Sequence, residues 1–188
     1  DVDDATREEA AKGLAAIADP RSLDALISAC ADEYWSVRAH AGSALAKLGG
    51  PQVAEALIGL FNDPIMEVRN QAVEAAASLG TAGLDRMIAA LKDERWRVRE
   101  HAAKTCGEIR DRKAVEALIV ACRDRDGAVK SAAAEALGKI GDAKAVPVMI
   151  KLFRDTSKIV RETAGTALVY IGEPSVDSLI ECFKDKDF

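Results

Sequence analysis

The chain has 188 residues, of which 49% are apolar and only 4% aromatic. Its core must therefore be built from Ala, Leu, Ile and Val, which favours closely packed helices over a β-sandwich or barrel, whose strands prefer aromatic and β-branched residues. Charged residues make up 30% of the chain with a net charge of −5, which argues against a protein whose main task is to grip nucleic-acid phosphates.

Targeting and disulfide signals are missing from the sequence. No run of 18 apolar residues is present, so the sequence predicts no membrane-spanning helix. The opening stretch DVDDATREEA is acidic and does not have the pattern of a signal peptide. Four Cys residues do not make a disulfide framework in a chain of this length. These features favour a cytoplasmic location.

A Val followed by a basic residue recurs along the chain, and the basic residues are 30 or 31 positions apart. An Asp stands six positions before each basic residue, and an Ile or Leu stands ten positions after it. Such a period predicts a repeat architecture. The pairs are Val37-Arg38, Val68-Arg69, Val98-Arg99, Val129-Lys130 and Val160-Arg161, with Thr6-Arg7 as a degenerate first copy.

Each copy of the repeat predicts two helices. After the basic residue, apolar positions follow at helical spacing, and in most copies a Gly comes next, where a left-handed residue closes a helix at little steric cost. Ala18 and Arg110 take the place of that Gly in two copies, so we expect less regular helix ends there. Pro20, Pro51 and Pro174 then share a phase near the first turn of the second helix.

A single helix pair cannot bury its apolar face alone, but it can when it stacks on its neighbours. The sequence therefore predicts an all-α fold, an α-solenoid of about six helix pairs that forms one domain over residues 1–188. The copies are expected at 1–31, 32–62, 63–92, 93–123, 124–154 and 155–184, and 185–188 would begin a seventh. Because Asp1 begins in phase and Phe188 ends inside the next copy, we expect a segment of a longer array.

This period resembles the HEAT-like repeats of the phycobilin-lyase type over essentially the whole chain. The best-matching stretch is VKSAAAEALGKIGDAKAVPVMIKLFRD, residues 129–155. The resemblance implies that an Asp and an Arg six positions apart, such as Asp32 and Arg38, form a hydrogen-bonded ladder between successive repeats. Lys130 replaces the Arg after Asp124, and because Lys lacks the bidentate fork of Arg we expect a weaker rung there.

Six positions of each copy vary while the frame repeats, at −3, −2, +1, +2, +5 and +9 from the basic residue. The resemblance implies that they lie on an exposed, concave face. Both Trp and both His of the chain fall in this set, 61 positions apart, and Met66 lies between the two Trp. By contrast, the copy at 124–154 is bland at these positions, which are Gly127, Ala128, Ser131, Ala132, Glu135 and Lys139.

An apolar ridge edged by polar groups is typical of a partner-binding surface, where Trp and Arg often dominate the contacts. The candidate partner-binding residues are Trp35, His40, Lys47, Met66, Asn70, Glu74, Trp96, Arg97, Glu100, His101 and Lys104.

Structural roles are the alternative for these residues. Each Trp could simply pack against the preceding repeat and shield its end. We expect the two His side chains to be solvated, and single His residues on alternate repeats lack the spacing of metal ligands. All four Cys occupy the phases of core residues and are expected to be small core side chains. They are Cys30, Cys106, Cys122 and Cys182.

The sequence favours a non-enzymatic protein–protein interaction scaffold that binds a protein or peptide on its concave face. We expect no cofactor, metal or catalytic residue, since no P-loop, dinucleotide fingerprint, HExxH or nucleophile elbow is present. The resemblance leaves open a phycobilin lyase-like enzyme or chromophore chaperone, and a structural spacer in a larger protein is a third hypothesis. Nucleic acid is disfavoured as a partner because the variable positions carry nine acids and six bases, and no membrane partner is expected.

Overall fold

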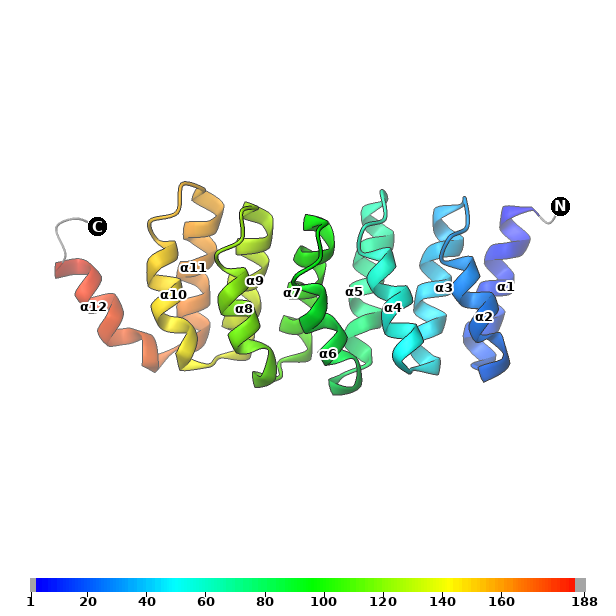
Figure 1. The fold of residues 1–188 in the computed structure, drawn as a ribbon, viewed down its shortest axis with the longest axis horizontal. Helices are drawn as coiled ribbons and strands as arrows, with labels where there is room; N and C mark the ends of the chain where they lie inside the picture. Colours follow the sequence, from blue (N-terminus) through cyan, green and yellow to red (C-terminus); the bar gives the residue numbers. More distant parts are fainter. Residues whose placement is uncertain (1–2, 185–188) are drawn as a thin grey trace. The chain divides into compact units, whose positions relative to one another are not determined.

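The all-α class is confirmed by the structure, a computed structural model that describes residues 3–184 (Figure 1). Within these residues the chain forms helices and turns and no strand. The first helices of the pairs are α1 (Asp4–Ile17), α3 (Trp35–Leu48), α5 (Met66–Ser78), α7 (Trp96–Ile109), α9 (Gly127–Ile140) and α11 (Lys158–Ile171). The second helices are α2 (Leu23–Ala29), α4 (Pro51–Leu60), α6 (Thr81–Ala90), α8 (Val115–Ala121), α10 (Val146–Leu152) and α12 (Val176–Lys184).

Short 3₁₀ turns lead into four of the second helices. They are η1 (Pro20–Ser22), η2 (Arg112–Ala114), η3 (Ala143–Ala145) and η4 (Glu173–Ser175). Pro51 is the first residue of α4, while Pro20 and Pro174 lie in η1 and η4, so all three prolines stand at the start of a helical segment as expected. The predicted seventh copy at 185–188 and the phase of Asp1 lie outside the described residues.

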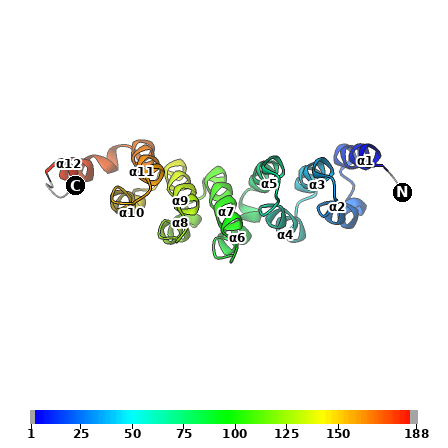
Figure 2. The same ribbon diagram turned by 90° about the horizontal axis from the view of Figure 1, so that it is seen from above.

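The chain divides into two compact units, Asp1–Ala90 and Leu91–Phe188. In the first unit α3 packs against both α1 and α5, and α2 and α4 pack against the first helix of the following pair. In the second unit α9 contacts α7 and α11 in the same way, with α8 and α10 behind them (Figure 2). Helix pairs are therefore stacked within each unit, whereas a single array over residues 1–188 stays a prediction.

The second unit depends on close approach between its first helices. A Cβ atom at Gly107 would lie only 2.8 Å from the Cα of Ala136, and one at Gly138 would lie 2.9 Å from the Cα of Ala167. Backbone thus meets backbone between α7 and α9 and again between α9 and α11. This packing explains how a core with so few aromatic residues becomes dense.

Three of the first helices, α1, α7 and α9, end in the same left-handed conformation. Gly141 has a φ of 72°, and its N–H donates to the carbonyl of Leu137. Ala18 and Arg110 adopt the same left-handed conformation, with φ of 53° and 57°, and make the equivalent hydrogen bond. The expectation of less regular ends at these two residues is therefore wrong, because the helix stop imposes its geometry even where a Cβ atom is present.

The ladder between repeats differs from the pairing that the resemblance implied. Arg38 Nη1 donates to the main-chain carbonyl of Asp32, six residues earlier, at 2.8 Å. Its Nε and Nη2 donate to the carboxylate of Asp63, 25 residues later, at 2.6 and 2.9 Å. Arg38 therefore clamps a carbonyl of its own repeat to the carboxylate of the next, and Arg99 does the same with Asp93 and Asp124, whereas Arg69 bonds to the carbonyls of Asp63 and Pro64. The same carboxylate bonds occur at Arg7–Asp32 and Arg99–Asp124.

Lys130 occupies the Arg position of the ladder in the copy at 124–154. Its Nζ contacts the carboxylate of Asp155. Arg99, by comparison, donates twice to the carboxylate of Asp124 and also to the carbonyls of Asp93 and Glu94. The ammonium group therefore supplies fewer hydrogen bonds than the guanidinium at the same position.

Candidate functional site

A groove with a volume of about 460 Å³ crosses α7, α9 and α11 in the second unit. It is lined by Glu100, Lys104, Gly127, Ala128, Ser131, Ala132, Glu135, Ser157, Ile159 and Thr163. Except for Ser157, each of these residues stands at one of the positions that vary between the repeats. The middle helix, α9, supplies the smallest side chains, and the surface is hollow because the longer side chains of α7 and α11 rise on both sides.

A second hollow of about 320 Å³ continues this groove along α9 and α11. It shares Glu135, Ile159 and Thr163 with the first and adds four further lining residues, Lys139, Glu162, Thr166 and Tyr170. The side chains of Ile159 and Tyr170 are each 68% exposed, so they offer apolar surface at its edge. We call the two hollows together the α9 groove.

The charged side chains that line the α9 groove lie in ion pairs, with partners inside the groove or beside it. Lys104 Nζ lies 2.6 Å from the carboxylate of Glu100. Lys139 Nζ lies 2.8 Å from Glu108 and 2.7 Å from Glu135. Partial burial lowers the pKa of Lys139, but the hydrogen bonds to these two carboxylates outweigh it and the pKa is raised. The groove therefore presents a nearly neutral surface with fixed ion pairs along its sides.

Two hydroxyl groups lie next to one another in the groove. The Ser131 Oγ and Thr163 Oγ1 atoms are 3.1 Å apart, and so they join α9 to α11. Thr163 Oγ1 also donates to the carbonyl of Ile159 at 2.8 Å. Because both hydroxyl protons are donated within the chain, this pair can accept a hydrogen bond from a main-chain N–H of a peptide but has no proton left to donate.

The candidate residues of the second unit have different surroundings. Glu100 and Lys104 line the α9 groove, and Trp96, Arg97 and His101 are not among its lining residues. The Arg97 guanidinium stacks over the Trp96 ring, 4.8 Å from its centroid. His101 is only 3% exposed and its Nδ1 lies 2.7 Å from the carbonyl oxygen of Arg97, so the expectation of a solvated side chain is wrong for this residue.

In the first unit Trp35 lines another groove, with a volume of about 520 Å³, at the N-terminal ends of α3 and α5. We call it the Trp35 groove. Its lining residues are Ala31, Asp32, Glu33, Tyr34, Trp35, Arg38, Asp63, Pro64 and Ile65.

Two residues of the Trp35 groove depart from the usual chemistry of helix starts. Tyr34 and Ile65 hold the N-cap positions of α3 and α5, and neither makes a side-chain capping bond. Asp3 and Asp126 make that bond at α1 and α9, whereas Arg95 and Ser157 make none at α7 and α11. Replacing a capping side chain costs about 1 kcal/mol. Two exposed apolar residues therefore stand where polar ones would stabilise the helices better.

The other candidates of the first unit lie outside the Trp35 groove. Met66 is 64% exposed beside Ile65, and Asn70 and Glu74 are exposed on α5. Lys47 Nζ donates to the carbonyl of Ala15 at 2.8 Å. His40 Nδ1 lies 2.7 Å from the carbonyl oxygen of Ser36 and 4.0 Å from the carboxylate of Glu8.

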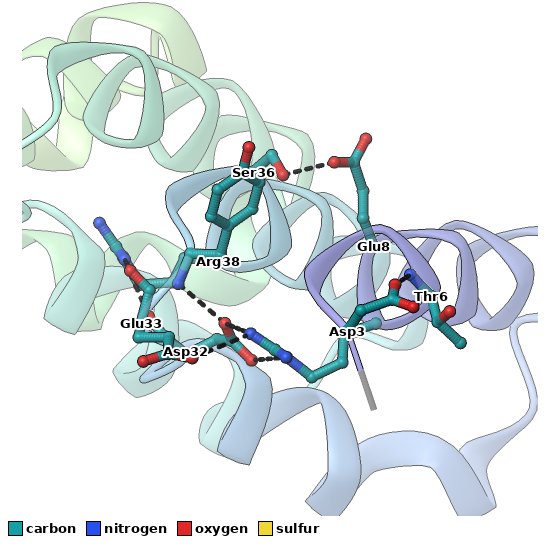
Figure 3. Close-up of polar contacts among 9 residues, drawn as sticks. Asp3, Thr6, Glu8, Asp32, Glu33, Ser36 and Arg38 are labelled. Atoms are coloured by element: carbon teal, nitrogen blue, oxygen red, sulfur yellow. Dashed lines mark hydrogen bonds and ion pairs between the residues drawn. The ribbon is translucent and has the colours of Figure 1, made fainter. Parts of the chain in front are cut away.

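Glu8 ties the first repeat to the second. The Ser36 hydroxyl donates to its carboxylate at 2.5 Å (Figure 3). Hydrogen bonds from Lys12 and then from Ser36 lower the pKa of Glu8. Since Trp35 and Trp96 belong to different units, their placement on one common face stays a prediction.

Metal and thiol chemistry have little support in the described part of the chain. Among residues 3–184, no group of three or more His, Cys, Asp or Glu side chains is placed to hold a metal ion. Cys106 and Cys122 are buried, and burial raises the pKa of each thiol to about 12. Nor does any helix in this region have the length and apolar character needed to cross a bilayer.

Stacked helix pairs with a hollow face of variable residues define a helical-repeat protein. The family model for HEAT repeats matches residues 1–77, 60–129, 84–168 and 115–188, and the chain belongs to this family. Membership of the HEAT repeat family is thus confirmed over the whole chain. No curated protein matches this chain.

Solved structures share the fold at low sequence identity. The complex of CpcE and CpcF of phycocyanin lyase from Nostoc sp. PCC7120 is 23% identical with a TM-score of 0.57, covering 87% of this chain and 70% of that one. An engineered protein is 24% identical with a TM-score of 0.53, covering 92% and 93%. A structure of Kap95p with RanGDP is 14% identical with a TM-score of 0.68, covering 93% and 29%. Identities this low indicate the fold alone.

Proposed function

We propose that this protein is a non-enzymatic scaffold that binds a peptide or an extended segment of a protein in the α9 groove. The observation that carries the proposal is that the groove is lined by the positions that vary between repeats while the frame around them stays constant. Variation restricted to one hollow face is what a recognition surface of a repeat protein requires.

The chemistry of the groove suits a peptide better than a reacting small molecule. The Ser131 hydroxyl donates to Thr163 and can still accept a hydrogen bond from a main-chain N–H, and the exposed Ile159 and Tyr170 can pack against apolar side chains of the partner. The lining carboxylate of Glu100 is engaged by Lys104, so it is not a free acid or base. An enzyme of the phycobilin-lyase kind rests on family resemblance alone, and no feature of the groove favours it.

A peptide-selection experiment tests the proposal. Random peptides displayed on phage are selected on the wild-type protein, and each enriched peptide is then synthesised and measured by fluorescence anisotropy. The variant Ala128→Arg fills the groove from α9, whereas Val120→Arg adds the same side chain at a 65% exposed position of α8 that does not line the groove.

We expect Ala128→Arg to weaken binding by about tenfold or more, as loss of a central contact does, and Val120→Arg to leave it unchanged. Circular dichroism verifies that both variants fold. Failure to enrich any peptide, or peptides that bind the two variants equally well, would contradict the proposal.

A further inference from the structure

The two Trp residues occupy the same phase of the repeat but have different neighbours. The Trp96 ring carries the guanidinium of Arg97, 4.8 Å from its centroid. The residue that follows Trp35 is Ser36, which is only 6% exposed and donates to Glu8 (Figure 3). In the part of the chain that the structure describes, no cation lies over the Trp35 ring. The Trp96 ring therefore has a cationic partner within the chain and the Trp35 ring has none among the described residues, although the two residues are similarly exposed, 38% and 41%.

The surroundings of Trp35 fit the stem of a long side chain. Its ring is 41% exposed and lines the Trp35 groove together with Tyr34, Pro64 and Ile65. Tyr34 and Ile65, the uncapped helix starts described above, are 40% and 39% exposed. Among the first helices of the pairs, the starts of α7 and α11 lack a side-chain cap as well, but only Tyr34 and Ile65 place apolar side chains there, and both of these line the groove with the indole. Arg and Lys bury their aliphatic stems along such surfaces.

The charges of the groove favour a cation. Three carboxylates line it, those of Asp32, Glu33 and Asp63, against the single guanidinium of Arg38. Arg38 is already committed to Asp63, and Arg7 binds Asp32. Glu33 is 89% exposed, and its contact with Arg7 is long, at 3.5 Å. Glu33 is therefore the carboxylate in this groove that is accessible to a second cation.

We propose that the Trp35 groove binds an arginine side chain of a peptide partner, with the guanidinium over the Trp35 ring and in reach of the Glu33 carboxylate. The proposed ligand reproduces, between two molecules, the stack that Arg97 and Trp96 make within one. This site is separate from the α9 groove and stands independently of the function proposed for that groove.

NMR of the indole groups tests the proposal on the full chain. The protein has only two Trp, so a ¹⁵N-labelled sample gives two indole N–H signals, which Trp35→Phe assigns. The probe is a short acetylated Gly-Arg-Gly amide. Its control is the same peptide with citrulline, which keeps the shape of arginine and removes the charge. Signals from Trp96, which already carries Arg97, provide an internal reference.

We expect the arginine peptide to shift the Trp35 signal saturably and to bind about threefold to fivefold more tightly than the citrulline peptide, with Trp96 unaffected. Glu33→Gln should weaken binding by about threefold and reduce its salt dependence. Glu94→Gln is the matched control, because Glu94 stands two residues before Trp96 as Glu33 does before Trp35.

Equal shifts with the citrulline peptide, or Glu33→Gln binding as tightly as wild type, would overturn the proposal. The Ala128→Arg protein should bind the arginine peptide normally. Binding of the arginine peptide to this variant tests the Trp35 groove separately from the α9 groove, so the two proposals can fail independently.

Discussion

Arg110 ends α7 in a left-handed conformation with a φ of 57°. For a residue with a Cβ atom this conformation costs roughly 1–2 kcal/mol, and Gly avoids that cost. Part of the gain is lost because Gly is freer in the unfolded chain. We therefore predict that Arg110→Gly raises the free energy of unfolding by about 0.5–1 kcal/mol.

Urea denaturation measures the effect of Arg110→Gly, and Ala18→Gly, whose φ is 53°, should behave alike. The reverse substitution, Gly141→Ala at a φ of 72°, should lower the midpoint. If all three variants had the same urea midpoint as the wild-type protein, these helix ends would not be strained.

Thiol reactivity gives a second prediction for single residues. Burial raises the pKa values of Cys30, Cys106 and Cys122 to about 12, so almost no thiolate forms at neutral pH. We predict that Cys106 and Cys122 do not react with Ellman's reagent in the folded protein near pH 8 and react promptly in denaturant. Rapid labelling of either residue without denaturant, read by mass spectrometry, would contradict their placement in the core.

Among the helices, the contact of α7 with α9 is the most sensitive to added volume. A methyl group at Gly107 would lie 2.8 Å from the Cα of Ala136, and backbone cannot move aside as a flexible side chain can. We predict that Gly107→Ala destabilises the protein by about 1–3 kcal/mol. In the same unit, Gly165→Ala meets only an ordinary contact, 3.6 Å from Phe153, and should stabilise by up to about 1 kcal/mol. If thermal unfolding showed that both Gly107→Ala and Gly165→Ala stabilise the protein, the close approach of α7 to α9 would be refuted.

The ladder predicts a gain of stability at Lys130. An Arg at this position has the donors to bind both oxygens of Asp155 and the carbonyls that precede it, as Arg99 does in the repeat before. Since the side chains of Lys130 and Asp155 are 18% and 11% exposed, solvent screens the pair only partly. We predict that Lys130→Arg adds about 1 kcal/mol to the free energy of unfolding and that Arg99→Lys removes a similar amount. Unchanged midpoints for both variants would mean that the second and third donors contribute nothing.

The helix pairs could be predicted from the sequence because the Asp, the basic residue and the closing residue recur at one period. The sequence could not predict which Asp carboxylate binds each Arg of the ladder. Each Arg has one Asp six residues before it and another about 25 residues after it, and spacing alone does not say which carboxylate accepts. In Arg38 the earlier residue offers its carbonyl and the later one its carboxylate. Only the stacking of neighbouring repeats decides this.

The candidate site was predicted only in part, for a related reason. The variable positions do line the α9 groove, but the candidates chosen from the sequence came from the three copies at 32–62, 63–92 and 93–123, two of which carry Trp and His. The hollow instead lies over Gly127, Ala128 and Ser131, where side-chain volume is small. A hollow forms where small side chains lie between larger ones. A search for large or charged side chains in the sequence therefore does not find it.

For the molecule as a whole, the ladder makes the free energy of unfolding decrease at low pH. Hydrogen bonds from Arg7 and Lys130 lower the pKa values of Asp32 and Asp155 below the ordinary value of 3.8. A carboxyl group whose pKa is lower in the folded state stabilises fully above its unfolded pKa, and this contribution disappears as the pH falls through the folded value. We predict a urea midpoint that changes little between about pH 7 and pH 5 and falls steeply below about pH 4.

Asp32→Asn should have a lower midpoint at neutral pH and a shallower decline in acid, because one of the titrating groups is gone. If the urea midpoint of the wild-type protein did not change down to about pH 3, the pKa values of the ladder carboxyl groups would be the same in the folded and unfolded states.

The hollow of α9 also bears on how such a protein changes over time. Ala128 and Ser131 face the groove, while Gly138 and Ala136 on the same helix hold it against its neighbours. Ser131 also bonds to Thr163 and so joins α9 to α11, but substitution of Ala128 can alter which ligand fits without disturbing these contacts. A lineage carrying this helix is therefore free to explore new specificities by single mutations, each step passing through a protein that still folds.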